Sequence, residues 1–255
     1  MTEQKVAFIT GGDSGIGYGI SEVFAQHKVN IAMVSYAKDH LPKAAKELAD
    51  KYGVDVLPVY ADISKEEDVK DAMAKTIDHF GHLDYAVNDA GISGQFKAFH
   101  ELTADDFDKT MNVDLRGTFL SMSAEIKQFV KQGKGSIVNI SALGAQLAEP
   151  SMSLYIAAKS GVNGLTRSVA MDYADKGIRV NAVSPGAVRT PMTASTLDDT
   201  SEGSFGSLLL STIPMKRVAD PKEIGEAVYF VSSDKASYMT GEIVSVDGGS
   251  SVGGH

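Results

Sequence analysis

Two residues with complementary proton chemistry stand four positions apart in the second half of the chain. Tyr155 and Lys159 fall in a segment with helical spacing, which places both side chains on one face of the helix. A free tyrosine has a pKa of about 10, and a nearby ammonium group lowers it towards the pH at which proton exchange with an alcohol is efficient. A Tyr-x3-Lys pair also occurs on ordinary solvated helices, so its meaning depends on the residues that accompany it.

Two further polar residues could join this pair. Ser141 closes a strand-like run at 136–140, and its hydroxyl could donate a hydrogen bond to a carbonyl oxygen at the carboxyl edge of a parallel sheet, where such folds bind ligands. Asn112 stands between Met111 and Val113 in a long helical stretch. Taken singly, it fits a hydrogen-bonded core asparagine better than a member of a buried proton relay.

A glycine-rich turn near the start has the chemistry of a pyrophosphate site. It follows an apolar run at 6–10 and opens a helical pattern at 16–27, which is the strand–turn–helix context that a dinucleotide-binding motif needs. Glycines there let the backbone approach a pyrophosphate, and the helix N-terminus supplies free N–H groups. The spacing is Gly-x3-Gly-x-Gly, and a plain tight turn is the alternative reading. The candidate cofactor residues of the turn are Gly11, Asp13, Ser14, Gly15, Ile16 and Gly17.

The end of the second strand bears on the choice between NAD(H) and NADP(H). Dinucleotide domains usually carry an acidic residue there to hold the ribose 2′-hydroxyl, but this chain has Tyr36, with Lys38 close behind. A missing carboxylate removes repulsion against a 2′-phosphate, and Lys38 could pair with one. Asp13 in the turn would repel a 2′-phosphate and so argues against NADP(H). We therefore expect NADP(H) to be favoured, with NAD(H) as the alternative.

The elements that position these residues alternate between short apolar strands and longer helices. This alternation predicts right-handed βαβ units in a single α/β domain over 1–255: a Rossmann-type, doubly wound, parallel seven-stranded sheet with helices on both faces. The predicted strands are 6–10, 31–34, 54–60, 83–87, 136–140, 179–183 and 242–246, and the helices are 16–27, 41–52, 68–80, 104–131, 153–174 and 221–231. The Ser-, Thr- and Gly-rich stretch at about 190–213 breaks the pattern and is interpreted as a substrate flap.

Composition narrows the function classes. The net charge of -9 argues against nucleic acid and anionic membrane partners. The chain has no cysteine, which excludes disulfides and thiolate zinc sites, and no metal site is predicted; His255 is expected to be solvated. The first residues do not resemble a signal peptide, and no apolar run of about 18 residues occurs. A cytoplasmic protein is the expectation.

Taken together, these motifs resemble the short-chain dehydrogenase/reductase family over essentially the full length. The resemblance rests on their order and spacing. The matching residues are the turn 10–17, Asp62, the Asn88-Asp89-Ala90-Gly91 segment, Asn112, Ser141, Tyr155 with Lys159, Pro185-Gly186 with Thr190, and the segment 246–249. The resemblance implies an NAD(P)-dependent oxidoreductase that interconverts a neutral ketone and a secondary alcohol.

The resemblance also implies a role for each matching residue. Asn112, Ser141, Tyr155 and Lys159 look like the catalytic tetrad of the family. Tyr155 would be the general acid or base, and Ser141 would polarise the substrate oxygen. Lys159 would bind the nicotinamide ribose and lower the tyrosine pKa, and Asn112 would hold a water that links Lys159 to solvent. The remaining cofactor contacts would come from Asp62, Ile63, Asn88, Ala90, Gly91, Pro185, Gly186, Val188 and Thr190.

Two features separate this chain from the usual family pattern. The family usually has a second asparagine where Asp89 stands, a position that mostly stabilises the central sheet, so we expect a structural effect there. The second-strand end lacks both the NAD-type acid and a clear NADP-type arginine.

The residues expected to line the substrate pocket are mostly apolar or small, and no lysine or arginine is among them. Its predicted lining includes Ser93, Gly94, Gln95, Phe96, Leu143 and Leu147. Two alternatives remain open: a 3-oxoacyl-carrier-protein reductase, for which Lys127, Lys131 and Lys134 could form a basic patch, and a catalytically inactive dinucleotide-binding scaffold. The resemblance also implies a homotetramer.

Overall fold

Seven parallel strands form the centre of the molecule. The computed structural model describes residues 4–191, 193–194, 201 and 204–253. The sheet order is β3-β2-β1-β4-β5-β6-β7. The strands are β1 (Val6–Thr10), β2 (Asn30–Ser35), β3 (Val56–Tyr60), β4 (Tyr85–Asn88), β5 (Gly135–Ile140), β6 (Ile178–Pro185) and β7 (Ile243–Val246). This confirms the predicted parallel, doubly wound sheet.

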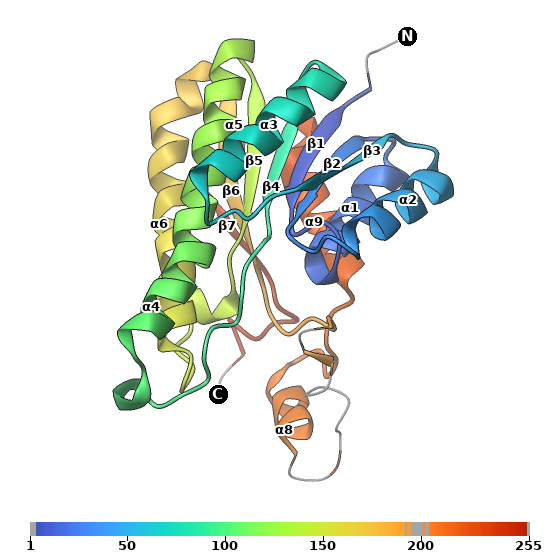
Figure 1. Ribbon diagram of the computed structural model, residues 1–255. Helices are drawn as coiled ribbons and strands as arrows, with labels where there is room; N and C mark the ends of the chain where they lie inside the picture. Colours follow the sequence, from blue (N-terminus) through green and yellow to red (C-terminus); the bar gives the residue numbers. More distant parts are fainter. Residues whose placement is uncertain (1–3, 192, 195–200, 202–203, 254–255) are drawn as a thin grey trace.

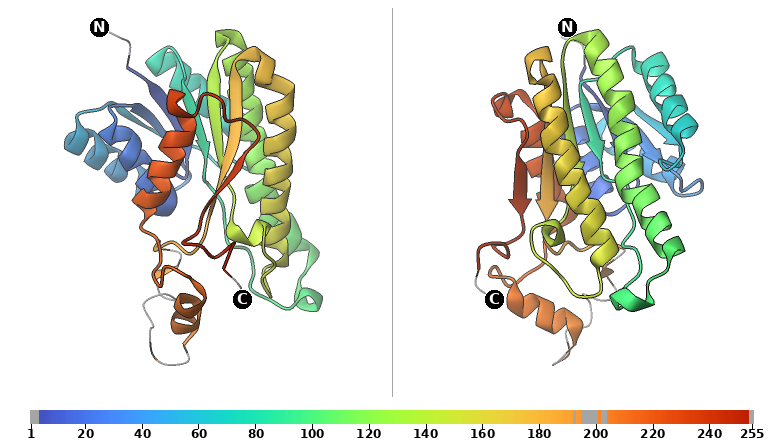
Figure 2. Two further views of the ribbon diagram at one scale, coloured as in Figure 1. Left: turned by 180° about the vertical axis from the view of Figure 1, so that it is seen from behind. Right: turned by 90° about the vertical axis from the view of Figure 1, so that its left-hand side faces the viewer.

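Helices cover both faces of this sheet, as Figures 1 and 2 show. On one face α1, α2 and α9 bury an apolar core against the strands, and on the other α3, α5 and α6 do the same. Their bounds are α1 (Gly15–Gln26), α2 (Leu41–Tyr52), α3 (Glu66–Phe80), α5 (Thr118–Gln132), α6 (Ser153–Tyr173) and α9 (Pro221–Ser232). Strands that are covered on both faces need apolar side chains on both, which explains why β1 and β2 read as continuous hydrophobic runs.

The direction of winding reverses between β1 and β4. The chain runs from β1 outward to β2 and β3, and then returns to place β4 against the other side of β1. Ligands of open α/β sheets bind at the carboxyl ends of the strands where this reversal occurs. The glycine-rich turn leaves β1 at that point, and the Asn88–Gly91 segment leaves β4 beside it.

The long helical stretch predicted at 104–131 forms, but it is not regular. It consists of α4 (Ala104–Met111), a π-helical turn η2 (Asn112–Gly117) and then α5. A π-helical turn adds a residue to the helical cycle and is often found at functional sites, because it redirects the side chains around it. Among the described residues, no helix is long and apolar enough to cross a membrane.

The predicted flap at 190–213 contains a helix that the sequence interpretation missed. Helix α8 (Phe205–Thr212) begins after Ser204, whose hydroxyl accepts a hydrogen bond from Ser207 N at 3.1 Å. Figure 1 shows α8 standing apart from the sheet, on the side towards which the strands point. Flap residues 192, 195–200 and 202–203 lie outside the described residues, as does His255.

The shorter segments are η1 (Phe99–Glu101), η3 (Leu143–Ala145), η4 (Ala174–Lys176) and η5 (Asp234–Ala236). Of these, η3 begins two residues after Ser141, which follows the end of β5.

Candidate active site

The glycine-rich turn between β1 and α1 has the shape that a dinucleotide requires. Gly11 and Gly15 adopt left-handed conformations, with φ of +70° and +54°. A Cβ atom added at Gly17 would lie 2.1 Å from the carbonyl oxygen of Gly11, so no side chain fits there. Ser14 precedes α1 without a side-chain cap, and no acidic residue stands in the first helical turn. The N–H groups at this helix end can therefore face an anion such as a pyrophosphate.

The segment that leaves β4 is fastened to this turn. The hydroxyl of Thr10 accepts hydrogen bonds from Asp89 N at 3.2 Å and Ala90 N at 3.3 Å. The Asp89 carboxyl accepts a hydrogen bond from the backbone of Gly17, and its Oδ2 atom lies against Gly11 as well. Asp89 thus holds the glycine-rich turn, whereas the sequence led us to expect a role in the central sheet. Burial raises the pKa of Asp89 to about 7, although Lys159 opposes that effect.

The ribose end of the predicted groove is polar and partly paired. His40 Nδ1 lies 3.2 Å from Asp13 Oδ2, and Asp13 is almost fully buried. Lys38 Nζ lies 4.6 Å from the centre of the Tyr60 ring. Tyr36 is 72% exposed. The Asp13 carboxylate therefore has a partner within the protein, and the Lys38 ammonium lies at the edge of the sheet near the end of β3.

Three predicted cofactor contacts have side chains that are occupied elsewhere. Asp62 accepts hydrogen bonds from the backbone and hydroxyl of Ser64, which hold its pKa below the usual range. Ile63 is buried against Gly117 in a small apolar cluster. Asn88 donates to Asn139 and to Glu125 beneath the sheet. Asp62, Ile63 and Asn88 can reach a cofactor chiefly through their backbone atoms.

Tyr155 and Lys159 lie on α6, and the lysine is 4% exposed. Lys159 Nζ donates to the carbonyl oxygen of Ile140 at 2.9 Å, which fixes the ammonium at the end of β5, and it lies 5.7 Å from the centre of the Tyr155 ring. Burial raises the pKa of Tyr155 above its usual value, while the Lys159 charge lowers it. The predicted effect of the lysine is present, but burial outweighs it in the protein without ligands.

Ser141 follows Ile140 directly, so it stands at the same strand end as the Lys159 ammonium. Its residue is 2% exposed, and its hydroxyl oxygen has no hydrogen-bond partner among the described residues. A buried hydroxyl without a partner is uncommon and is often explained by a ligand or water that completes it. The Ser141 hydroxyl is thus available to a substrate oxygen.

The structure brings Asp114, and not Asn112, to the lysine. A Cβ atom added at Gly91 would lie 3.3 Å from Asp114 Oδ1 and 3.5 Å from Lys159 Nζ, so these two charged groups flank the same point. Asn112 lies two residues earlier in η2, where residues do not share a helix face. Its side chain has no hydrogen bond in the part of the chain that the structure describes. The sequence signal for Asp114 was an acidic residue between the apolar residues Val113 and Leu115, and the sequence interpretation overlooked it.

The predicted contacts for the far end of the cofactor come from the segment after β6. Gly186 N donates to Val246 O at 3.0 Å, and a Cβ atom at Gly186 would lie 2.9 Å from the Cα atom of Asp247. Val188 is buried, and Thr190 lies against Gly15 of the glycine-rich turn. Thr190 and the turn therefore face each other, as two sides of one groove would.

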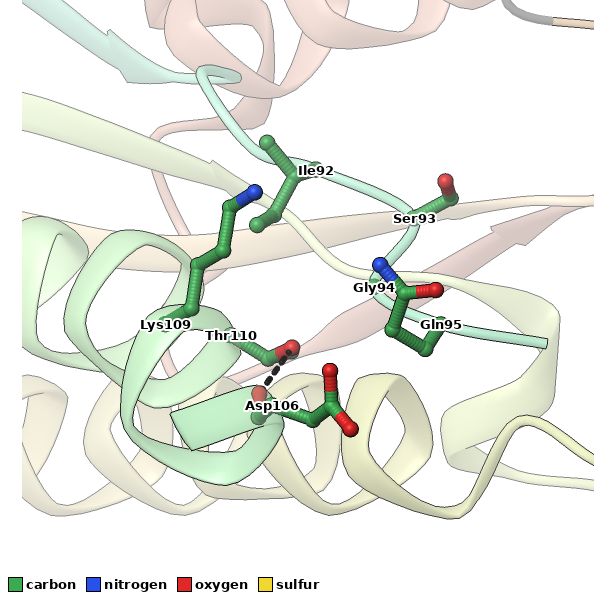
Figure 3. A pocket seen from close by; sticks show the side chains of 7 residues that line it. All are labelled: Ile92, Ser93, Gly94, Gln95, Asp106, Lys109 and Thr110. Atoms are coloured by element: carbon green, nitrogen blue, oxygen red, sulfur yellow. Dashed lines mark hydrogen bonds between the residues drawn. The ribbon is translucent and has the colours of Figure 1, made fainter. Parts of the chain in front are cut away.

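A pocket of about 110 Å³ opens beside the predicted substrate loop (Figure 3). It is lined by Ile92, Ser93, Gly94, Gln95, Asp106, Lys109 and Thr110. Ile92 connects this pocket to the catalytic residues, because its backbone N–H donates to Asp114 Oδ1 at 2.8 Å. Helix α4 adds Asp106 and Lys109 to this pocket, two charged residues that the predicted lining did not include; the composition of the substrate pocket itself stays a prediction.

The other predicted pocket residues do not join this cavity. Leu143 and Leu147 lie together around η3, where Leu147 N donates to Leu143 O at 2.9 Å, and both are partly buried. Phe96 is 63% exposed. The two leucines follow Ser141, so they remain candidates for the apolar side of a substrate site.

Comparison with known proteins gives full-length similarity. A family model described as Enoyl-(Acyl carrier protein) reductase matches residues 11–251. The chain is 37% identical to 2-(R)-hydroxypropyl-CoM dehydrogenase of Xanthobacter autotrophicus over 96% of this chain and 97% of that protein. The structure of levodione reductase superposes with a TM-score of 0.92, at 34% identity and with 98% of both chains covered.

A further solved structure carries a cofactor. The 3-ketoacyl-(acyl-carrier-protein) reductase from Brucella melitensis complexed with NADH matches with a TM-score of 0.90 and 33% identity, covering 99% of this chain and 100% of that one.

Proposed function

Because the chain belongs to the short-chain dehydrogenase/reductase family and is an NAD(P)-dependent oxidoreductase of alcohols and ketones, we propose that Tyr155 is its proton carrier. The observation that carries this proposal is the arrangement of side chains where β5 ends against α6. There the Lys159 ammonium, fixed by Ile140 O, lies 5.7 Å from the centre of the Tyr155 ring, and the unpartnered Ser141 hydroxyl follows Ile140 directly. The glycine-rich turn leaves β1 at the same carboxyl edge of the sheet.

The chemistry divides between the cofactor and the protein. A bound nicotinamide dinucleotide supplies or accepts the hydride. The hydroxyl of Ser141 donates a hydrogen bond to the substrate oxygen and orients it. Tyr155 gives a proton to that oxygen during ketone reduction and removes one during alcohol oxidation. Lys159, held by Ile140 O, stabilises the phenolate form of Tyr155 by its positive charge. For Asn112, the role of holding a water near Lys159 stays a prediction.

The cofactor is proposed to be NADP(H) in preference to NAD(H). The end of β2 has no acidic residue to repel a 2′-phosphate, and Lys38 lies at that edge of the sheet. Asp13 argued against a phosphate, but His40 lies against its carboxylate and can offset that charge when protonated. The glycine-rich turn, with backbone contributions from Ile63 and Ala90, would hold the rest of the dinucleotide.

The proposed substrate is a neutral ketone or secondary alcohol with polar substituents. Ser93, Gln95 and Thr110 offer hydrogen-bonding groups, and the charges of Lys109 and Asp106 occur in the same pocket. A pocket with both charge signs favours hydroxyl or carbonyl groups over a single strong anion. The leucines at 143 and 147 would contact the less polar side.

A 3-oxoacyl-carrier-protein reductase is the second candidate, supported by the similarity to the Brucella melitensis enzyme. The basic residues predicted for carrier docking do not favour it. Lys127 and Lys131 lie in the later half of α5, and Lys134 directly precedes β5. They stand at the amino edge of the sheet, opposite the strand ends that carry Ser141, so a carrier bound there would be far from the proposed site.

One experiment tests the proton carrier and the substrate class together. The parent enzyme is offered hydroxylated ketones, apolar ketones and a 3-oxoacyl thioester, each with NADPH and NADH, while the absorbance of the reduced nicotinamide is followed. We expect turnover of the polar ketones and a loss of at least 100-fold in kcat for Tyr155→Phe, since a positioned acid or base contributes about 10²–10⁴-fold. Full activity of Tyr155→Phe would reject Tyr155 as the proton carrier, and an inactive parent would favour the scaffold alternative.

The assembly is proposed to be a homotetramer. Large apolar side chains are exposed on α4 and α5, at Phe107 and Phe119, and near the carboxyl end of the chain, at Tyr238 and Val252. Exposed apolar residues on separate faces suit more than one interface between copies. Sedimentation equilibrium of the purified protein measures the assembly directly.

A further inference from the structure

Asp114 is a fully buried acid in the catalytic corner. The residue is 0% exposed, and it projects from the π-helical turn η2 towards α6. Its Oδ1 atom accepts a hydrogen bond from Ile92 N at 2.8 Å. Its Oδ2 atom is buried and has no hydrogen-bond partner among the described residues. A carboxyl oxygen that is removed from water without a partner is costly, and such a group calls for an explanation.

Two features of α6 shape the surroundings of the Asp114 carboxyl: the Lys159 ammonium and Gly161. A Cβ atom at Gly91 would lie 3.3 Å from Asp114 Oδ1 and 3.5 Å from Lys159 Nζ, yet these two groups form no ion pair in the part of the chain that the structure describes. Gly161, two residues after Lys159 on α6, has no side chain, and Leu115 packs into that space, which lets η2 approach α6 closely.

The charged groups that act most strongly on the pKa of the Tyr155 phenol come from four segments. Lys159 on α6 favours the phenolate form, while Asp114 on η2, Asp89 after β4 and Glu149 before α6 oppose it. Asp89 is itself shared with the glycine-rich turn, where it faces Asp13 and the N–H of Gly17. Of the three acids, Asp114 raises the pKa of Tyr155 most. Lys159 is in turn the charged group that most strongly affects the pKa of Asp114, which it lowers.

We propose that Asp114 is a positioning residue whose carboxylate sets the pH range in which Tyr155 exchanges its proton. The proposal rests on the proposed function of Tyr155. The ionised carboxylate stabilises the Lys159 ammonium and repels the phenolate of Tyr155, so it raises the pH at which the phenol ionises. Removing this one charge while keeping the shape of the side chain lowers that pH.

The sign of the effect is the same in both reaction directions. Alcohol oxidation needs the phenolate and therefore fails below the ionisation of Tyr155. Ketone reduction needs the phenol and therefore fails above it. When Tyr155 ionises at a lower pH, the lower pH limit of oxidation and the upper pH limit of reduction both fall. A loss of activity through damaged structure would lower both rates without moving either limit.

The test compares the parent with Asp114→Asn, in which the amide oxygen can still accept from Ile92 N. We expect the pH limits of kcat for both oxidation and reduction to fall by about 0.5–1 pH unit, as the loss of one nearby charge at a moderate effective dielectric implies. Glu125→Gln is the matched control. It replaces another fully buried acid, on α5, that is not among the charged groups acting most strongly on Tyr155, and its pH limits should equal those of the parent.

Each other outcome has a definite meaning. Unchanged limits in Asp114→Asn, with or without a lower kcat, overturn the proposal, as does a shift to higher pH. If Asp114→Asn does not fold by circular dichroism, Asp114→Ser replaces it with the same expected shift, since a hydroxyl can also accept from Ile92 N. An active Tyr155→Phe variant rejects the proposed function itself and not the role of Asp114 alone.

Discussion

Lys38 is the residue that we propose to favour NADP(H) over NAD(H). Its ammonium group lies 4.6 Å from the centre of the Tyr60 ring, an attraction worth about 0.5–1 kcal/mol at an exposed site. A charge-assisted contact to a phosphate is worth about 1.5–3 kcal/mol, so moving from the ring to a 2′-phosphate remains favourable. Tyr36, which is 72% exposed, stands directly after β2, where the usual NAD-type acid is absent.

We expect Lys38→Ala to weaken NADP(H) binding by about 5- to 30-fold and to leave NAD(H) binding almost unchanged, because the contact energies above differ by roughly 1–2 kcal/mol. Fluorescence titration of both reduced cofactors measures this. Lys43→Ala removes an exposed lysine from α2 and should affect neither affinity. Equal losses for the two cofactors would show that Lys38 does not recognise the 2′-phosphate.

At the scale of the element, α6 positions Tyr155 and Lys159, the two side chains proposed to be catalytic, and it packs closely against η2. Two of its glycines differ sharply in their surroundings. A Cβ atom at Gly164 would meet nothing within 4 Å, whereas one at Gly161 would lie 2.8 Å from Cδ1 of Leu115. Gly164 only weakens the helix, whereas Gly161 makes room for Leu115, the residue after Asp114.

This difference predicts opposite effects for two alanine substitutions in one helix. Gly164→Ala should raise the free energy of unfolding by about 0.5–1 kcal/mol, because alanine is the better helix former and the space is open. Gly161→Ala gains the same helix preference but must displace Leu115, which should cost about 1–3 kcal/mol. Urea unfolding gives both values, and kcat should fall only in Gly161→Ala. Equal stabilities would mean that η2 moves aside without cost.

For the whole molecule, the buried acids Glu22 and Glu125 give stability opposite dependences on pH. Glu22 is nearly buried, and its pKa is about 2: burial raises it, but hydrogen bonds from Lys51, Tyr52 and Lys222 outweigh that and lower it. It stabilises the fold above the unfolded pKa of about 4.5, and this contribution is lost as the pH falls towards 2. Burial raises the pKa of Glu125 to about 8, so folding becomes less favourable as the pH rises from about 4.5 to 8.

Glu125→Gln should therefore stabilise the protein more at pH 8 than at pH 5. The glutamine cannot ionise, so the variant avoids the cost of keeping a carboxyl protonated, which is a few kcal/mol at most for a shift of this size. Thermal unfolding at both pH values measures the difference. A constant difference in Tm between parent and variant across this range would show that Glu125 does not carry that cost.

The sequence by itself determined the order of the predicted elements and placed their ends within about two residues of the observed ones. The β1 and α2 bounds match the prediction, because continuous apolar runs and helical spacing are local signals. The glycine-rich turn and the Tyr155–Lys159 pair were equally visible, since the spacing of residues within one turn or one helix is fixed by the chain. Helix α8 was missed because its Ser- and Gly-rich surroundings give a weak periodic signal.

The tertiary structure alone decided which residues from different elements meet. Asp114, from the π-helical turn, lies near Lys159, whereas Asn112 of the same turn is exposed. No spacing in the sequence predicts where a helix becomes a π-helix. The contact of Asp89 with Gly17, the pairing of His40 with Asp13 and the approach of Lys109 to the loop at Ser93 each join segments far apart in the chain. Such contacts depend on how helices pack against the sheet, and packing is set by the complete set of side chains and not by any local pattern.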